Sequence, residues 1–120
     1  EPFGWAGVTL TDLDGLTGLP EYRNGGLLLD AGVIVPRASD FAQRSYRADA
    51  EFIIEWRALT VNLLDQIAVM LRERLGRSAA QMPLACVLEG GTWAAGREIA
   101  QEQRAAGAPP LRIESDGTIF

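Results

Sequence analysis

The chain has 120 residues, of which 48% are hydrophobic and 22% charged, and it carries a net charge of −5. This composition is typical of one globular domain with a core of useful size. All of its 11 basic residues are arginine, histidine is absent, and there is a single cysteine. The chain therefore cannot itself build a Ser-His-Asp triad, a Schiff-base lysine, a zinc site of His and Cys, or a disulfide. We expect no metal and no cofactor.

The negative net charge and the hydropathy of the sequence also restrict which binding partners are expected. A protein that binds a nucleic-acid polymer is normally basic, and a membrane span needs about 18 consecutive apolar residues, which this chain lacks. One cysteine fits a reducing compartment. We expect a cytoplasmic protein that binds neither a nucleic-acid polymer nor a membrane. A small nucleotide-derived ligand remains compatible with the charge, because a pocket needs positive charge only locally.

The N-terminal residues 1–23 are rich in glycine, aspartate, threonine and proline and predict a loop with short helical turns. The segment Pro20–Ala31 predicts a short helix, because Pro20 suits a first turn and Gly32 suits a C-terminal end. Gly25 and Gly26 each disfavour a helix interior by about 1 kcal/mol relative to alanine. They therefore indicate close packing or the close approach of a ligand.

Residues 37–48 follow as a polar connector, with Phe41 and Tyr46 as anchors. The run from Asp49 to Gly76 then predicts one long helix, because its apolar residues recur with the helical period. The positions on one arc of this helix are Ile53, Ile54, Val61, Leu64, Ala68, Leu71 and Leu75. Further apolar residues widen the arc beyond half of the circumference, which predicts a central helix buried on two sides.

Arg57 lies in the middle of this apolar arc, where the pattern calls for an aliphatic side chain. A buried guanidinium without a partner is very unfavourable, so we expect Arg57 to be mostly buried and to contact a carboxylate, carbonyls or an anion. Glu55 lies on the opposite side of the helix and cannot pair with it. The candidate partners are Glu21, Asp30, Glu89, Asp116 and a ligand phosphate. Arg57 is therefore either half of a structural ion pair or part of an anion site.

Pro83 predicts the start of a second helix, which the segment Glu89–Thr92 breaks. A third helix is predicted from Trp93 to Ala106, with Thr92 as its cap. The Glu89–Thr92 segment is either an anion-binding turn at a helix N-terminus or a plain connection between helices. Cys86 stands in an apolar run with no base beside it and is predicted to be a core residue.

The C-terminal segments 111–114 and 118–120 flank Ser115-Asp116-Gly117 and predict a small β-hairpin. Asp116 is either a turn residue or a ligand-facing carboxylate. Together with the helices, this pattern predicts a mainly α-helical bundle with a small C-terminal β-hairpin.

The block Glu21-Tyr22-Arg23 precedes Asn24-Gly25-Gly26, so a carboxylate and a guanidinium lie next to glycines. This arrangement can face a ligand. The alternative is a solvated first turn, in which Glu21 complements the positive end of the helix dipole.

Four blocks of the sequence resemble the C-terminal part of the uracil-catabolism protein family, which is catalogued as a domain of unknown function. These blocks are residues 22–27, 55–60, 88–97 and 115–118. The resemblance extends over essentially the whole chain. Because members of that family are much longer, it implies that residues 1–120 are the C-terminal part of a single larger helical domain, with the N-terminal portion absent.

The chain also resembles the queuosine-salvage N-glycosidases, which are similar in fold to helical DNA glycosylases. The segments Pro20–Arg23, Ala31-Gly32 and Glu55–Ala58 follow the order of an acid-Tyr-Arg block, a Leu-Gly pair and a Glu-Ile-Arg-Ala helix in those enzymes. Their catalytic carboxylate is an aspartate, and Glu21 stands at that position here, one methylene longer. The resemblance implies a DNA-glycosylase-like helical bundle and a catalytic role for Glu21.

These resemblances imply a hydrolase of uracil catabolism that cleaves the N-glycosidic bond of a ribosylurea-type nucleotide. A carboxylate suits this chemistry, because it stabilises an oxocarbenium-like transition state and orients water. Beside Glu21, the expected substrate-binding residues are Arg23, Arg57, Trp56, Trp93 and Asp116. The alternatives are an amide hydrolase acting on the ring-opened uracil nucleotide, and a non-catalytic nucleotide-binding or scaffold protein.

The apolar arc of the long helix exceeds what three shorter helices and a hairpin can cover. We therefore expect it to pack against the absent N-terminal portion or against another chain. For the same reason we expect residues 1–120 alone to be catalytically silent.

Overall fold

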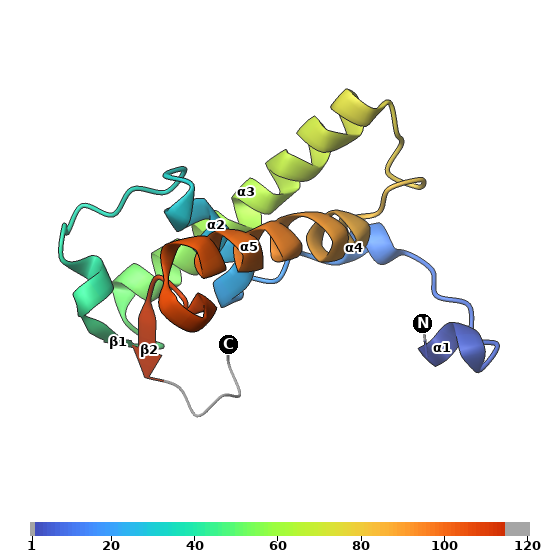
Figure 1. Cartoon of the computed structure of the whole chain (residues 1–120). Coiled ribbons are helices and arrows are strands. Elements are labelled where there is room, and N and C mark those ends of the chain that lie inside the picture. The colour runs from blue at the N-terminus through green and yellow to red at the C-terminus, as the bar shows by residue number, and fades with distance from the viewer. Residues whose placement is uncertain (1, 115–120) are drawn as a thin grey trace.

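The computed structural model describes residues 2–114, and this part of the chain is mainly helical. Its elements are α1 (Pro2–Trp5), α2 (Tyr22–Asp30), β1 (Ser45–Arg47), α3 (Glu51–Leu75), α4 (Leu84–Val87), α5 (Trp93–Gln103) and β2 (Arg112–Glu114). Short 3₁₀ turns lie at Leu13–Gly15, Phe41–Gln43 and Ala105–Gly107. Figure 1 shows α2 and α5 beside the first half of α3, while the second half of α3 projects away from them.

The long helix is confirmed as α3, and it ends at Gly76, which takes a left-handed conformation with φ of 59°. Its buried side chains recur at spacings of three and four residues, as one helical face requires. They are Ile53, Trp56, Thr60, Leu64 and Ala68. The wide arc is only partly covered within the described residues, because Ile54, Val69, Met70 and Leu75 are each more than half exposed.

The short helix is confirmed as α2, with two differences at its start. Glu21, rather than a residue inside the helix, is the N-cap, and its Oε1 accepts a hydrogen bond from the Asn24 backbone N–H at 2.6 Å. Pro20 lies just outside the helix. At the other end, Gly32 has φ of 70° and closes the helix as expected.

The two glycines of α2 serve close packing. A Cβ at Gly25 would lie 2.3 Å from Trp56 Cζ2 and 2.9 Å from Thr60 Oγ1, so only a glycine lets α2 approach α3 this closely. The Trp56 indole N–H donates to the Gly25 carbonyl at 3.1 Å. A Cβ at Gly26 would stand 3.2 Å from Pro110 Cδ. The contact between α2 and α3 is therefore set by the absence of a side chain.

The predicted break between the second and third helices is wrong, because residues Leu88–Thr92 form a π-helical turn that joins α4 to α5. The buried positions along this composite helix are Leu84, Val87, Thr92, Gly96 and Ala100. Every step along this list is three or four residues, except the step of five from Val87 to Thr92. A π turn holds one extra residue and keeps both flanking stretches buried on the same side. Thr92 has helical backbone angles and is not a side-chain cap.

Helix α5 ends at Gln103, three residues before the predicted end, and Ala106 and Gly107 then adopt positive φ angles of 59° and 65°. Helix α5 packs on α2 at Gly96, where a Cβ would lie 2.2 Å from the Arg23 carbonyl oxygen. Thr92 Oγ1 donates to Asn24 Oδ1 at 2.8 Å, and both side chains are buried. This hydrogen bond fixes the register of α5 along α2.

The strand β2 is present at the predicted first arm of the hairpin, but it pairs in parallel with β1, with Tyr46 opposite Ile113. Strand β1 lies in the segment predicted to be a polar connector, so that prediction was wrong there. The second arm, residues 118–120, lies outside the described residues. Cys86 is exposed, which corrects its predicted place in the core.

Two apolar clusters form the core. The cluster beside the sheet contains Leu29, Ile53, Trp56 and Leu111, and the cluster at the other end contains Ala68, Leu84 and Val87. Among the described helices, none is long and apolar enough to cross a membrane.

The close approach at Gly25 gives a direct test of this packing. Gly25→Ala places a methyl group against the rigid Trp56 ring, so we expect the free energy of unfolding to fall by about 2 kcal/mol in urea denaturation. Gly90→Ala is the control, because an added Cβ there meets nothing within 4 Å. The control should be neutral or more stable by up to about 1 kcal/mol. Equal effects of the two substitutions would contradict close packing of α2 on Trp56 at Gly25.

Candidate functional site

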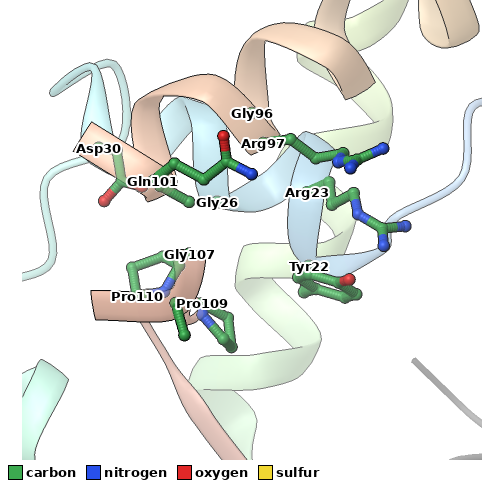
Figure 2. A pocket seen from close by; sticks show the side chains of 12 residues that line it. Tyr22, Arg23, Gly26, Asp30, Gly96, Arg97, Gln101, Gly107, Pro109 and Pro110 are labelled. Atoms are coloured by element: carbon green, nitrogen blue, oxygen red, sulfur yellow. The ribbon is translucent and has the colours of Figure 1, made fainter. Parts of the chain in front are cut away.

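A cavity of about 200 Å³ lies between α2, α5 and the segment that leads into β2. Figure 2 shows its walls: Tyr22 and Arg23 come from the first turn of α2, Arg97 and Gln101 from α5, and Pro109 and Pro110 from the segment before β2. The cavity is therefore bounded by elements that are far apart in the sequence and that meet because of the glycine contacts of α2.

Two arginines at one end of the cavity share an aromatic partner. The Arg23 guanidinium carbon lies 4.3 Å from the centre of the Trp93 ring and 4.7 Å from that of Tyr22. The Arg97 guanidinium carbon lies 5.8 Å from the Trp93 ring centre. These are cation–π distances, and a stacked guanidinium keeps its N–H edge available to a ligand. Figure 2 shows both guanidiniums at the end of the cavity away from Asp30.

Asp30, the one carboxylate among the lining residues, is already neutralised. Both of its carboxylate oxygens accept hydrogen bonds from Arg104, one of them at 2.8 Å. The Asp30 side chain is only 5% exposed, so this bidentate pair is held largely out of water. Within residues 2–114, neither Arg23 nor Arg97 forms an ion pair with a carboxylate. The cavity consequently has two uncompensated positive charges.

Glu21, the predicted catalytic carboxylate, is half-buried at the start of α2, directly before two residues that line the cavity. Its Oε1 is engaged by the cap to Asn24, while Oε2 has no hydrogen-bond partner in the described part of the chain. Glu21 itself does not line this cavity. Glu21 therefore caps α2 through one carboxylate oxygen, and the other is available to a ligand.

The other predicted binding residues are dispersed. Arg57 is only half-buried, against the expectation of a mostly buried side chain, and it has an interaction partner, but it does not line the cavity. Trp56 is buried in the core, with its indole N–H bonded to α2. Asp116 lies outside the described residues. Of the predicted set, the structure brings together Arg23 and Trp93.

Arg97 lines the cavity but was not predicted as a binding residue from the sequence. It stands four residues after Trp93 in α5, a spacing that places the two side chains on one helix face. That spacing was available in the sequence as a signal. Whether Trp93 and Arg97 lie near α2 depends on the π turn, because this turn sets which face of α5 packs on α2. Among residues 2–114, no three His, Cys, Asp or Glu side chains gather as metal ligands.

The fold and the cavity define a mainly helical protein in which two crossing helices bound a cationic site. The chain belongs to the family described as "Protein of unknown function (DUF1688)", whose model matches residues 1–120. It is 46% identical over 107 residues to Protein urg3 of Schizosaccharomyces pombe, a match that covers 88% of this chain and 27% of that protein. It is 36% identical over 136 residues to Uracil catabolism protein 4 of Lachancea kluyveri, covering 100% of this chain and 30% of the relative.

The chain therefore spans less than a third of the length of these two relatives, and it matches their C-terminal part. No solved structure matches it. The predicted family resemblance is confirmed.

The ion pair between Asp30 and Arg104, beside the cavity, is expected to contribute to stability. Arg104→Gln leaves the Asp30 carboxylate without its counter-charge in a place that water hardly reaches, so we expect the free energy of unfolding to fall by about 3 kcal/mol. The double variant Asp30→Asn/Arg104→Gln should recover part of that loss, because no lone charge remains. Urea denaturation measures both.

Arg47→Gln is the matched control. Arg47 also makes a bidentate pair, with Asp49, but these side chains are 76% and 68% exposed. Water screens such a pair, so the midpoint of denaturation should not move. A loss in Arg47→Gln as large as that in Arg104→Gln would contradict the burial argument.

Proposed function

We propose that this chain is the C-terminal part of a hydrolase of uracil catabolism that cleaves the N-glycosidic bond of a ribosylurea-type nucleotide. The name of the Lachancea kluyveri relative supports the pathway. The family relationship over residues 1–120 makes that support relevant to the whole chain. The assignment of the reaction rests on the site itself.

The observation that carries the reaction type is the position of Glu21. Its carboxylate is oriented by the capping hydrogen bond from Asn24, and its chain neighbours Tyr22 and Arg23 line the cationic cavity. An oriented carboxylate with one unengaged oxygen, next to a site for an anionic substrate, is the arrangement that N-glycosidic hydrolysis needs.

In this reaction the bond between C1′ of the ribose and the urea nitrogen breaks. The sugar passes through an oxocarbenium-like state, whose positive charge the Glu21 carboxylate stabilises. Water, oriented by the same carboxylate, adds its oxygen to C1′, and one of its protons goes to the departing nitrogen. The products are ribose 5-phosphate and a urea, so atoms and charges balance. Arg57 and Asp116 remain proposed binding residues from the sequence.

Glu21→Gln tests this role. The amide oxygen of glutamine can still cap α2, but the residue has no negative charge, so we expect turnover of a ribosylurea nucleotide to fall by about 100-fold or more. Substrate binding should change little. Glu102→Gln is the control, because Glu102 is an exposed residue of α5 that does not line the cavity, and it should keep full activity.

The measurement is release of ribose 5-phosphate by the full-length polypeptide that carries this chain. Ribose 5-phosphate appears only when the glycosidic bond is cleaved. Turnover without it would identify the amide hydrolase instead. Ligand binding with no turnover in the unmodified protein would identify a nucleotide-binding or scaffold protein. Full activity in Glu21→Gln would remove Glu21 from the mechanism.

We also propose that α3 packs against the rest of the full-length polypeptide or against another chain, and its exposed apolar side chains support this. Ile54, Met70 and Leu75 are each more than half exposed in the chain by itself, and the relatives are more than three times as long as the segment that they share with it. We expect residues 1–120 alone to show no turnover. Cooperative unfolding together with full activity of this segment would refute that expectation.

A further inference from the structure

We propose that Arg23 and Arg97, which both contact the Trp93 ring, form the binding site for a phosphate monoester. The inference rests on the proposed function for the nature of the substrate, and it names the group of that substrate which enters the cavity. The cavity between α2 and α5 can hold this group, and the positive charge of the two arginines favours an anion.

The charge around the cavity favours an anion. The chain as a whole has a surplus of acidic residues, with 16 Asp and Glu against 11 Arg. Even so, Arg23 and Arg97 have no carboxylate partner within residues 2–114, and Asp30 is neutralised by Arg104. Two like charges beside one indole ring repel each other, and a bound anion offsets that repulsion because it attracts both.

The geometry favours a phosphate monoester over a singly charged group. A guanidinium presents a planar fork of N–H donors that matches two phosphate oxygens, and two such forks match a dianion. The Arg23 guanidinium carbon lies 4.3 Å from the Trp93 ring centre and 4.7 Å from the Tyr22 ring centre, and contacts with two rings restrict the guanidinium before the ligand arrives. Arg97 is exposed and lines the same cavity from α5.

The size of the cavity sets how much of the substrate it holds. Its volume of about 200 Å³ is smaller than the roughly 300–1,000 Å³ of sites that enclose drug-sized molecules. The cavity therefore suits the phosphate and the 5′ end of the sugar better than a whole nucleotide, with C1′ of the sugar at its edge. The remainder of the substrate lies beyond the cavity, towards the start of α2, where Glu21 stands.

Isothermal titration of the full-length protein with ribose 5-phosphate, inorganic phosphate and ribose tests the site. We expect ribose 5-phosphate and phosphate to bind and ribose to bind at least tenfold more weakly. Arg97→Gln should weaken ribose 5-phosphate binding about tenfold to a hundredfold, as the loss of charge-assisted hydrogen bonds implies. Arg97→Lys should be intermediate, because it keeps the charge and loses the fork.

Arg74→Gln is the matched control. It removes the same charge from an exposed position in the last turn of α3, away from the cavity, and should leave affinity unchanged. Thermal unfolding of each variant shows whether its fold is intact, which we expect because Arg97 is exposed. The proposal is overturned if Arg97→Gln binds as tightly as Arg74→Gln, or if ribose binds as tightly as ribose 5-phosphate.

The binding assay also separates this inference from the proposed reaction. Phosphate binding that depends on Arg97, in a protein with no glycosidic turnover, would support the site and reject the hydrolase. Turnover that depends on Glu21 but is indifferent to Arg97, with unchanged KM, would support the hydrolase and reject the site. Because titration needs no catalysis, it can equally be done on Glu21→Gln.

Discussion

The absence of side chains at two helix crossings determines the geometry of this protein. At Gly25 the backbone of α2 lies against the Trp56 indole, beside its Cε2 and Cζ2 atoms, and at Gly96 the backbone of α5 lies against the Arg23 carbonyl. Because Gly25 and Gly96 lie on different helices, α2 is clamped between α3 and α5. The Trp56 indole N–H bonded to the Gly25 carbonyl adds a directional constraint to this steric one, and it satisfies a donor that would otherwise be buried without a partner.

The cavity is a consequence of this clamp. When α5 lies as close to α2 as Gly96 permits, the next residue of α5, Arg97, stands beside the first turn of α2. The buried hydrogen bond between Thr92 and Asn24 prevents α5 from sliding along α2. Trp93, which follows Thr92, is thereby placed against Arg23. Packing residues and charged residues are neighbours along the same short segments. The packing of the core therefore fixes the positions of the charged side chains.

Sequence patterns predicted the elements of this fold better than their connections. Helix α3 was predictable because its apolar period is long and Gly76 ends it, and α2 was predictable from the glycine at its C-terminal end. The continuity of α4 with α5 was not, because Gly90-Gly91 normally interrupts a helix and the π turn depends on burying Val87 and Thr92 on the same side. The parallel pairing of β1 with β2 joins segments more than sixty residues apart, which no local pattern encodes.

The same distinction applies to the site. Arg57 stood out in the sequence because it interrupts an apolar arc. Such an interruption shows that a charged residue stands where an apolar one is expected, but it does not show where a ligand binds. Arg97 breaks no pattern, since α5 is exposed on that side, and its significance comes from the helix that lies opposite. Several residues of the blocks that resemble the family, including Asn24, Gly25 and Thr92, take part in close packing or in buried hydrogen bonds. Charged side chains without a partner of opposite charge, such as Arg23 and Arg97 among the described residues, are therefore a better guide to a binding site than these blocks as a whole.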